Sequence, residues 1–198
     1  VGILSTARLT HATPASAYAH SADRNFEDDS ELPEGCEVPD IAAQLIGAME
    51  SGMVDIAMGG GRRHFLPEDV QDEEGDTGRR TDGRNLVEEA KALGASYAFD
   101  SESFASIDPS AGPVLALFES SHMQYEFDRS GEPSLAEMVE ASIDALSGNE
   151  EGFFLAVEAG RVDHANHAGN LHRTVTDGVA FAEAVAKARE LTDESDTL

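Results

Sequence analysis

The feature that most constrains the fold of this chain is a predicted helix with a capping box, followed directly by an apolar strand. Ser134 and Glu137 are spaced as in a capping box, and apolar residues then recur at helical spacing until Gly148. The apolar run 153–158 follows at once and predicts a buried strand. Strands separated by helices pair in parallel, which predicts an α/β fold: a three-layer α/β/α sandwich with a mostly parallel central sheet.

Other segments repeat this alternation. Asp40 caps a predicted helix to Glu50, a strand follows at 54–58, and Asn85 with Glu88 opens a helix that ends at Gly94. The last predicted helix, 173–191, is expected to bury four residues: Val175, Val179, Ala184 and Val185. The acidic stretches 25–39 and 66–80 are rich in turn-forming residues and predict loops.

The triple glycine at 59–61 follows the predicted strand 54–58. Its spacing matches neither a P-loop nor a dinucleotide fingerprint. We therefore expect a tight turn at the end of the strand, rather than a phosphate cradle.

Candidate metal ligands follow the strand at 153–158. Glu158 ends the apolar run, at the carboxyl end where ligand-binding groups gather in open α/β sheets. Asp163 and His167 are four residues apart, so a helical turn places both on one face, and a carboxylate with an imidazole suits Zn²⁺. A D-x-x-x-H spacing also arises by chance in an acidic chain, so alone this motif is a weak signal.

A larger set of motifs, spread over nearly the whole chain, resembles the alkaline phosphatase family. Single members of the set are weak, but the combination is specific. The motifs are Ala12-Thr13-Pro14-Ala15, Ala19-His20 with Arg24, Ile56 to Arg63, Arg80 to Leu86, Leu117 to Glu119 with Tyr125-Glu126, Val157 to His167, and Leu191 to Leu198.

The resemblance implies a role for each matched residue. Thr13 and Glu158 correspond to ligands of a magnesium-type site, where hard oxygen donors suit a hard cation. Asp163 and His167 correspond to ligands of one of two catalytic zinc ions. Arg24 corresponds to the guanidinium that clamps phosphate. Without the motif around it, Arg24 would be interpreted as a surface residue paired with Asp23 or Glu27.

The histidines divide into two groups under this resemblance. Family members differ at the places of His11 and His164, and this chain has the version with two histidines, near the magnesium-type site. The alternative is that both lie in a second shell or face solvent. We favour that alternative for the remaining candidates: His20, His64, His122 and His172.

The resemblance also implies a candidate calcium site, as in vertebrate-like family members. Its ligands are Phe118 through its carbonyl, Glu119, and Glu132 before a Pro-Ser pair, with a fourth from the region 72–74. Oxygen ligands suit Ca²⁺. The alternative is an acid-rich surface without an ion.

For the complete enzyme, the family implies hydrolysis of phosphate monoesters through a phosphoserine intermediate, with zinc and magnesium. Residues 1–198 match the central segment of one domain, without the N-terminal nucleophile region and the C-terminal zinc-ligand region, so we expect the isolated chain to be inactive. A homodimer and a periplasmic or secreted location are implied by resemblance alone. Alternatives are a related phosphodiesterase or phosphomutase, or a non-catalytic acidic metal-binding module.

The net charge of the chain limits the kinds of binding partner, independently of the family resemblance. The chain has 39 Asp and Glu against 13 Lys and Arg, a formal net charge of -26. This charge disfavours nucleic acid and anionic membranes as partners, and no stretch is apolar enough for a membrane span. The acids are scattered rather than clustered, which indicates a solvated surface typical of proteins from salt-loving organisms.

Overall fold

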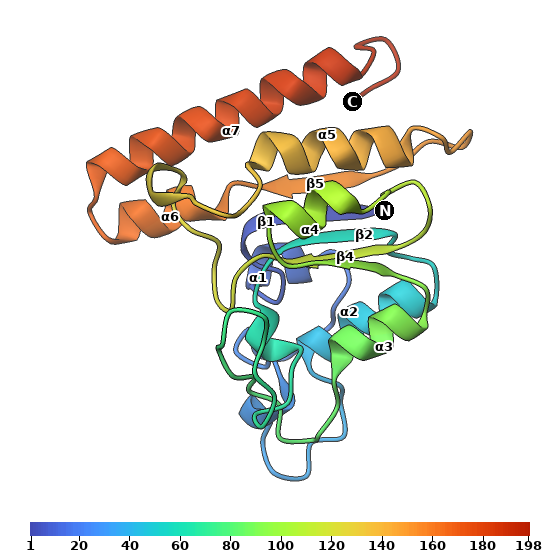
Figure 1. Ribbon diagram of the computed structural model, residues 1–198, viewed down its shortest axis with the longest axis vertical. Helices are drawn as coiled ribbons and strands as arrows, with labels where there is room; N and C mark the ends of the chain where they lie inside the picture. The colour runs from blue at the N-terminus through green and yellow to red at the C-terminus, as the bar shows by residue number, and fades with distance from the viewer.

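A parallel five-stranded sheet forms the centre of the molecule in the computed structural model, which describes residues 1–198. The strands follow the order β3-β4-β2-β1-β5, and every neighbouring pair is parallel (Figure 1). Their bounds are β1 Gly2–Arg8, β2 Ile56–Gly60, β3 Ser96–Ala98, β4 Val114–Leu117 and β5 Leu155–Glu158. The predicted α/β fold with a mostly parallel sheet is confirmed.

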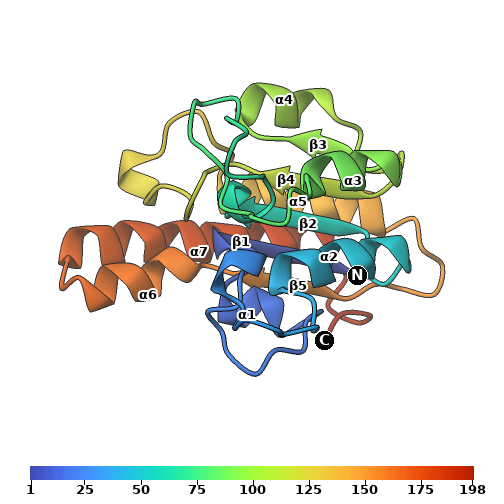
Figure 2. The same ribbon diagram turned by 90° about the horizontal axis from the view of Figure 1, so that it is seen from below.

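Helices cover both faces of this sheet (Figures 1 and 2). One core holds α1 (Ala12–Ala15), α2 (Ile41–Glu50) and α3 (Leu86–Ala92), and the other holds α4 (Ser101–Ser106), α5 (Leu135–Leu146) and α7 (Leu171–Leu191). In β1, Ile3 points into the first core and Leu4 into the second, as the alternation of a strand buried on both faces requires. The remaining helices are α6 (Gly160–His167) and the short 3₁₀ turns η1 (Asp29–Glu31), η2 (Arg62–His64) and η3 (Glu126–Asp128).

The predicted helix starts carry the expected caps. The Asp40 carboxylate accepts a hydrogen bond from the backbone N–H of Ala43 at 2.9 Å, and α2 begins at the next residue. Ser134 and Glu137 form a reciprocal capping box at α5. Asn85 caps α3 through its side chain. Local sequence therefore determines where these three helices begin.

Two burial predictions are wrong. Of the four residues expected to be buried on α7, only Ala184 is, whereas Val175, Val179 and Val185 are 54%, 53% and 45% exposed. The helix packs against α5 through its small residues, and the bulkier valines lie on other faces of the helix. The strand predicted at 153–158 is not buried either, because β5 is the sheet edge and pairs only with β1.

Gly59 and Gly60 are the last residues of β2, which runs two residues beyond the predicted strand, and only Gly61 lies in the turn after it. The backbone of a neighbouring loop passes very close to these glycines. A Cβ on Gly60 would lie 2.2 Å from the carbonyl oxygen of Ser121, so only glycine fits there. Gly61 takes the left-handed conformation with φ 104°.

None of the helices is long and apolar enough to cross a bilayer.

Candidate functional site

The carboxyl ends of β1 and β5 bring most of the predicted ligands to one edge of the sheet. β1 leads into α1, which has His11 as its N-cap and contains Thr13. β5 ends at Glu158, directly before α6. Ser5 and Glu158 are partners in the register of the two strands, and the Ser5 hydroxyl donates a hydrogen bond to Glu158 Oε2 at 2.6 Å. This edge is the usual position of a ligand site in a parallel sheet.

Asp163 and His167 lie on one face of α6, as their spacing predicted. Their side chains are 70% and 80% exposed, and His167 Nε2 is 3.5 Å from Asp163 Oδ2. Thr13 is also exposed, on a helix that packs against both β1 and β5. These oxygen and nitrogen donors are thus open to an incoming ion.

Arg24 lies at the same edge, in a contact that the sequence did not indicate. Its Nη2 is 3.0 Å from Nε2 of His11. The alternative pairing of Arg24 with Glu27 is wrong, because Arg8 holds Glu27 through two hydrogen bonds of 2.8 and 2.6 Å. Arg24 is exposed and keeps its charge available to an anionic ligand.

Three imidazoles meet beside Arg24. The ring centroids of His11, His122 and His164 are 4.2 to 5.6 Å apart, and one ring nitrogen of each lies within 4.8 Å of the other two. The sequence analysis expected His122 in a second shell or facing solvent, and the structure places it half-buried beside His11 and His164. His122 lies in the loop after β4, a strand that the sequence analysis did not predict, so no local signal placed it here.

Burial and neighbouring positive charges keep these three rings neutral. Burial, then Arg8 and His164, lower the pKa of His122 to about 2. Burial, then Arg8 and Arg24, lower the pKa of His11. The pKa of His164 is lowered by burial and then by Arg161. The cluster therefore presents unprotonated ring nitrogens at neutral pH.

The other histidines differ from one another. His20 and His172 are exposed, as expected. His64 is buried, with Nδ1 2.5 Å from a carboxylate oxygen of Asp28, so a solvent-facing position is wrong for it. His64 and Asp28 belong to the buried charged network around Glu27. They are not part of the group formed by the exposed side chains of Asp163 and His167 on α6.

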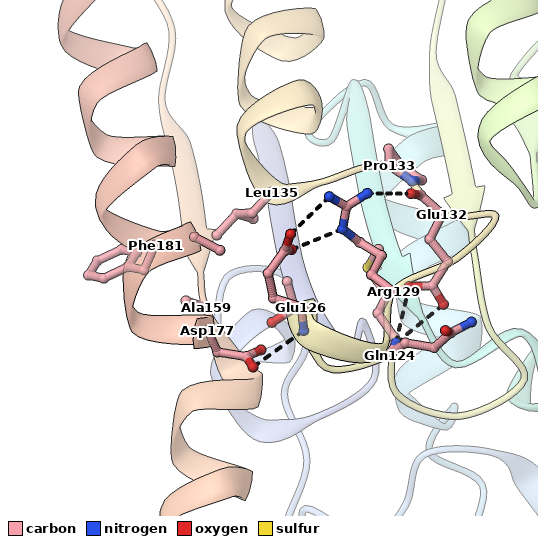
Figure 3. A pocket seen from close by; sticks show the side chains of 12 residues that line it. Gln124, Glu126, Arg129, Glu132, Pro133, Leu135, Ala159, Asp177 and Phe181 are labelled. Carbon is pink, nitrogen blue, oxygen red and sulfur yellow. Dashed lines mark hydrogen bonds and ion pairs between the residues drawn. The ribbon is translucent and has the colours of Figure 1, made fainter. Parts of the chain in front are cut away.

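The residues of the candidate calcium site also come together. The backbone N–H of Gln124 donates to Glu132 at 3.1 Å (Figure 3). The side-chain amide of Gln124 donates to Glu119 at 3.1 Å. Burial, opposed by the bond from Gln124 but reinforced by Glu119 and Glu74, raises the pKa of Glu132 to about 8. Phe118 is buried beside them at the end of β4.

The loop 72–74 reaches this acidic group, as expected for a fourth ligand. Glu74 acts electrostatically on both Glu119 and Glu132. The loop is held by the buried guanidinium of Arg62, which pairs with Asp72 at 2.8 Å and with Glu74. Arg62 therefore neutralises part of the acidic charge next to the candidate ion site.

Comparison with known proteins decides the family. The family model described as alkaline phosphatase matches residues 1–198. The chain belongs to the alkaline phosphatase family. Over its full length it is 42% identical to a membrane-bound alkaline phosphatase of Bombyx mori and 39% identical to the tissue-nonspecific isozyme of Rattus norvegicus. The crystal structure of Thermus thermophilus alkaline phosphatase superposes with a TM-score of 0.77 at 33% identity, over 93% of this chain and 34% of that one.

Two general properties of the alkaline phosphatase family bear on this chain. The family is one of phosphatase enzymes, and it is metal-dependent. The chain spans 38% and 40% of the length of these two curated relatives.

Proposed function

We propose that the full-length protein hydrolyses phosphate monoesters through a phosphoserine intermediate, with this chain supplying the phosphate clamp and part of the metal cage. One observation carries the proposal: Glu158, Arg24 with His11, and the α6 ligands gather at one edge of the sheet. Ser5, the serine paired with Glu158 at this edge, donates its hydroxyl to that carboxylate, so the proposal takes the attacking hydroxyl from outside these residues.

The donor sets fit the expected ions. Glu158 and Thr13 offer oxygen, which suits Mg²⁺, and Asp163 with His167 offers the carboxylate and imidazole that suit Zn²⁺. Asp163 with His167, and Thr13 with Glu158, would hold these ions, which would supply electrostatic stabilisation to the phosphoryl group. Arg24 donates two parallel hydrogen bonds to phosphate oxygens and stabilises the negative charge on them. Ser5 orients Glu158 by its 2.6 Å hydrogen bond.

Removal of one α6 ligand tests this proposal. In the full-length protein with zinc and magnesium, we expect His167→Ala to lower both the zinc content and the hydrolysis of p-nitrophenyl phosphate, by about 10²-fold or more in rate. His172→Ala is the matched control, since this histidine is exposed and follows α6. Equal activity of the two variants would contradict the proposal.

The same preparation separates the alternative chemistries. A phosphodiesterase would prefer bis(p-nitrophenyl) phosphate to the monoester, and a phosphomutase would release no inorganic phosphate. A non-catalytic module would bind zinc but hydrolyse neither ester. We expect the monoester to be preferred, because the exposed guanidinium of Arg24 can donate to two unesterified oxygens at once.

We further propose that Glu119, Glu132 and the Phe118 carbonyl hold a Ca²⁺ ion. The support is the pair of carboxylates joined through Gln124, and the burial and neighbouring carboxylates that raise the pKa of Glu132 to about 8. In calorimetric titration of the chain with Ca²⁺, Glu132→Gln should weaken binding about 10-fold or more, whereas the exposed Glu183→Gln should not. Unchanged binding in Glu132→Gln would exclude this site.

From family likeness alone, we place the full-length protein in the periplasm or outside the cell as a homodimer. Cell fractionation and size-exclusion chromatography test these two statements separately.

A further inference from the structure

Positively charged side chains without a carboxylate partner are rare in this acidic chain. Asp and Glu number 39 against 13 Lys and Arg, and ten of these 13 have a carboxylate oxygen within 4.0 Å. The three that have none are Arg24, Arg63 and Arg161. Arg63 follows β2 and Arg161 follows β5, so the unpaired positive charge gathers at the carboxyl edge of the sheet, where ligands bind in parallel sheets.

Two of these three guanidiniums have other contacts or a role already assigned. Arg24 is the proposed phosphate clamp. Arg161 lies against the ring of Tyr125, 3.7 Å from its centroid, and its Nη1 is 3.1 Å from a ring nitrogen of His164. Arg63 is left without a comparable partner.

The side chain of Arg63 is held at one atom and free at two. Its Nε donates to Nε2 of His64 at 3.3 Å, and Nδ1 of His64 is 2.5 Å from Asp28. Neither Nη atom of Arg63 has a hydrogen-bond partner in the chain, and neither is sealed from solvent. Two parallel N–H donors therefore remain available to the oxygens of an anion.

The glycine turn after β2 explains the position of Arg63. Gly60 lets the loop after β4 approach closely, and the backbone N–H of Arg63 donates to the carbonyl of Ser120 at 3.3 Å. The N–H groups of Gly61 and Arg62 both donate to the carbonyl of Glu119 at 3.0 Å. Because these backbone donors are used inside the protein, an anion at this turn has to be held by the Arg63 side chain.

The charges around Arg63 leave it without a negative partner of its own. Burial, then the positive charges of Arg8 and Arg79, lower the pKa of Arg63, against the effect of Glu27 and Asp28. Arg63 stays charged at neutral pH, since arginine titrates far above it. Glu27 is held by Arg8, and Asp28 by His64. An anionic ligand would therefore relieve repulsion between the guanidiniums.

A short series of side chains separates Arg63 from the phosphate clamp. Arg8, whose charge acts on Arg63, is 2.7 Å from Nε2 of His122. The ring centroid of His122 is 5.2 Å from that of His11, and Nε2 of His11 is 3.0 Å from Arg24. The two free guanidiniums thus lie at the same edge of the sheet, with Arg8 and two imidazoles between them.

We propose that Arg63 binds a second anionic group of the substrate, a phosphate or carboxylate remote from the ester that is hydrolysed. This inference rests on the proposed phosphatase function and narrows its substrate class to monoesters that carry a further negative charge. Arg24 would hold the reacting phosphoryl group, and the free Nη atoms of Arg63 would donate to the other group. A local contact is needed for such substrates, because the net charge of -26 repels them from the molecule as a whole.

Fructose 6-phosphate and fructose 1,6-bisphosphate form a matched pair for testing this inference in the full-length protein with zinc and magnesium. Initial rates of phosphate release are measured in molar salt, which screens long-range attraction and repulsion and leaves short-range contacts. We expect the wild type to have the higher kcat/KM for the bisphosphate. Arg63→Ala should lower this preference about 10-fold or more, the effect of losing charge-assisted hydrogen bonds.

Two further variants control the comparison. Arg63→Lys keeps the charge but loses the planar pair of donors, so it should retain part of the preference. Arg189→Ala removes an exposed arginine of α7 that pairs with Glu194, and it should keep the wild-type preference. The ratio of the two kcat/KM values in one preparation does not depend on the folded fraction, so partial misfolding of Arg63→Ala cannot imitate the expected result.

The outcomes separate this inference from the proposed function. An unchanged ratio in Arg63→Ala, including an equal loss on both substrates from a purely structural role, would overturn the second anion site and leave the phosphatase function standing. If the wild type hydrolyses neither ester, the proposed function fails, and the second anion site fails with it.

Discussion

The buried carboxylate of Glu27 should make a large, pH-dependent contribution to stability. Glu27 is 8% exposed, and it accepts hydrogen bonds from Arg8 at 2.8 and 2.6 Å and from the Thr10 hydroxyl at 2.6 Å. Burial alone would raise the pKa of Glu27, but the Arg8 hydrogen bond, His64 and the Thr10 hydroxyl outweigh it and lower the pKa from 4.5 to about 2. The ionised form is therefore favoured in the folded state.

The sign of this contribution follows from the lowered pKa. The stabilisation is complete above the unfolded-state value of 4.5 and is lost as pH falls toward about 2. At about 1.4 kcal/mol per pKa unit, the ionised carboxylate stabilises the fold by about 3 kcal/mol at neutral pH and by about 1 kcal/mol at pH 3. Glu27→Gln keeps the shape of the side chain and removes this charge.

Urea unfolding at pH 7 and pH 3 in molar salt measures the difference, because salt screens the surface charges more than the buried pair. We expect Glu27→Gln to lose about 3 kcal/mol at pH 7 and about 1 kcal/mol at pH 3. The exposed Glu34→Gln, on the loop before α2, is the matched control and should change little at either pH. A loss in Glu27→Gln that is the same at both pH values would refute this reasoning.

Three further predictions use thermal or urea unfolding of the chain. Gly60→Ala places a Cβ 2.2 Å from the Ser121 carbonyl oxygen and should lower the free energy of unfolding by about 3 kcal/mol. Gly47 is exposed on α2 with nothing nearby, so Gly47→Ala should raise the free energy of unfolding by about 0.5–1 kcal/mol. Similar effects of the two substitutions would contradict the close packing at Gly60. Ser134→Ala removes half of the α5 capping box and should cost about 1 kcal/mol, so an unchanged midpoint would show that tertiary packing alone sets this helix start. Because the net charge is -26, the unfolding temperature should rise between low and molar salt, by about 2–4 °C for each kcal/mol gained; a constant midpoint would refute the proposed salt adaptation.

The elements that could be predicted from the sequence are those marked by short local patterns, such as helix caps and residue spacing. Asp40, Asn85 and Ser134 cap their helices, and the spacing of Asp163 and His167 predicted one helical face. Such signals need no knowledge of the tertiary fold. They predicted where these helices begin and that Asp163 and His167 share one face of α6.

The sequence analysis did not predict strand β1, and the reason lies in the composition of that strand. Ser5 and Thr6 interrupt the apolar pattern in the carboxyl half of the strand, where they serve the site: Ser5 bonds Glu158, and the Thr6 hydroxyl accepts the backbone N–H of Arg161. Polar residues buried for a function break the pattern that indicates a strand.

The histidine cluster could not be predicted for a related reason. His122 joins His11 and His164 only because β1, β4 and β5 end at the same edge of the sheet. Its neighbours in sequence carry no ligand spacing, so local pattern gives no information about it. The contact of Arg24 with His11 likewise depends on the fold around α1.

The most direct test of the proposed phosphate site is the kcat/KM of the full-length protein for p-nitrophenyl phosphate at alkaline pH, with zinc and magnesium, in the wild type, Arg24→Ala and Arg84→Ala. Arg84 is a surface residue paired with Glu89 and serves as the control. We expect Arg24→Ala to lose about 10²-fold or more, and Arg84→Ala to match the wild type. Equal values for Arg24→Ala and the wild type would contradict the assignment of this edge of the sheet as the phosphate site.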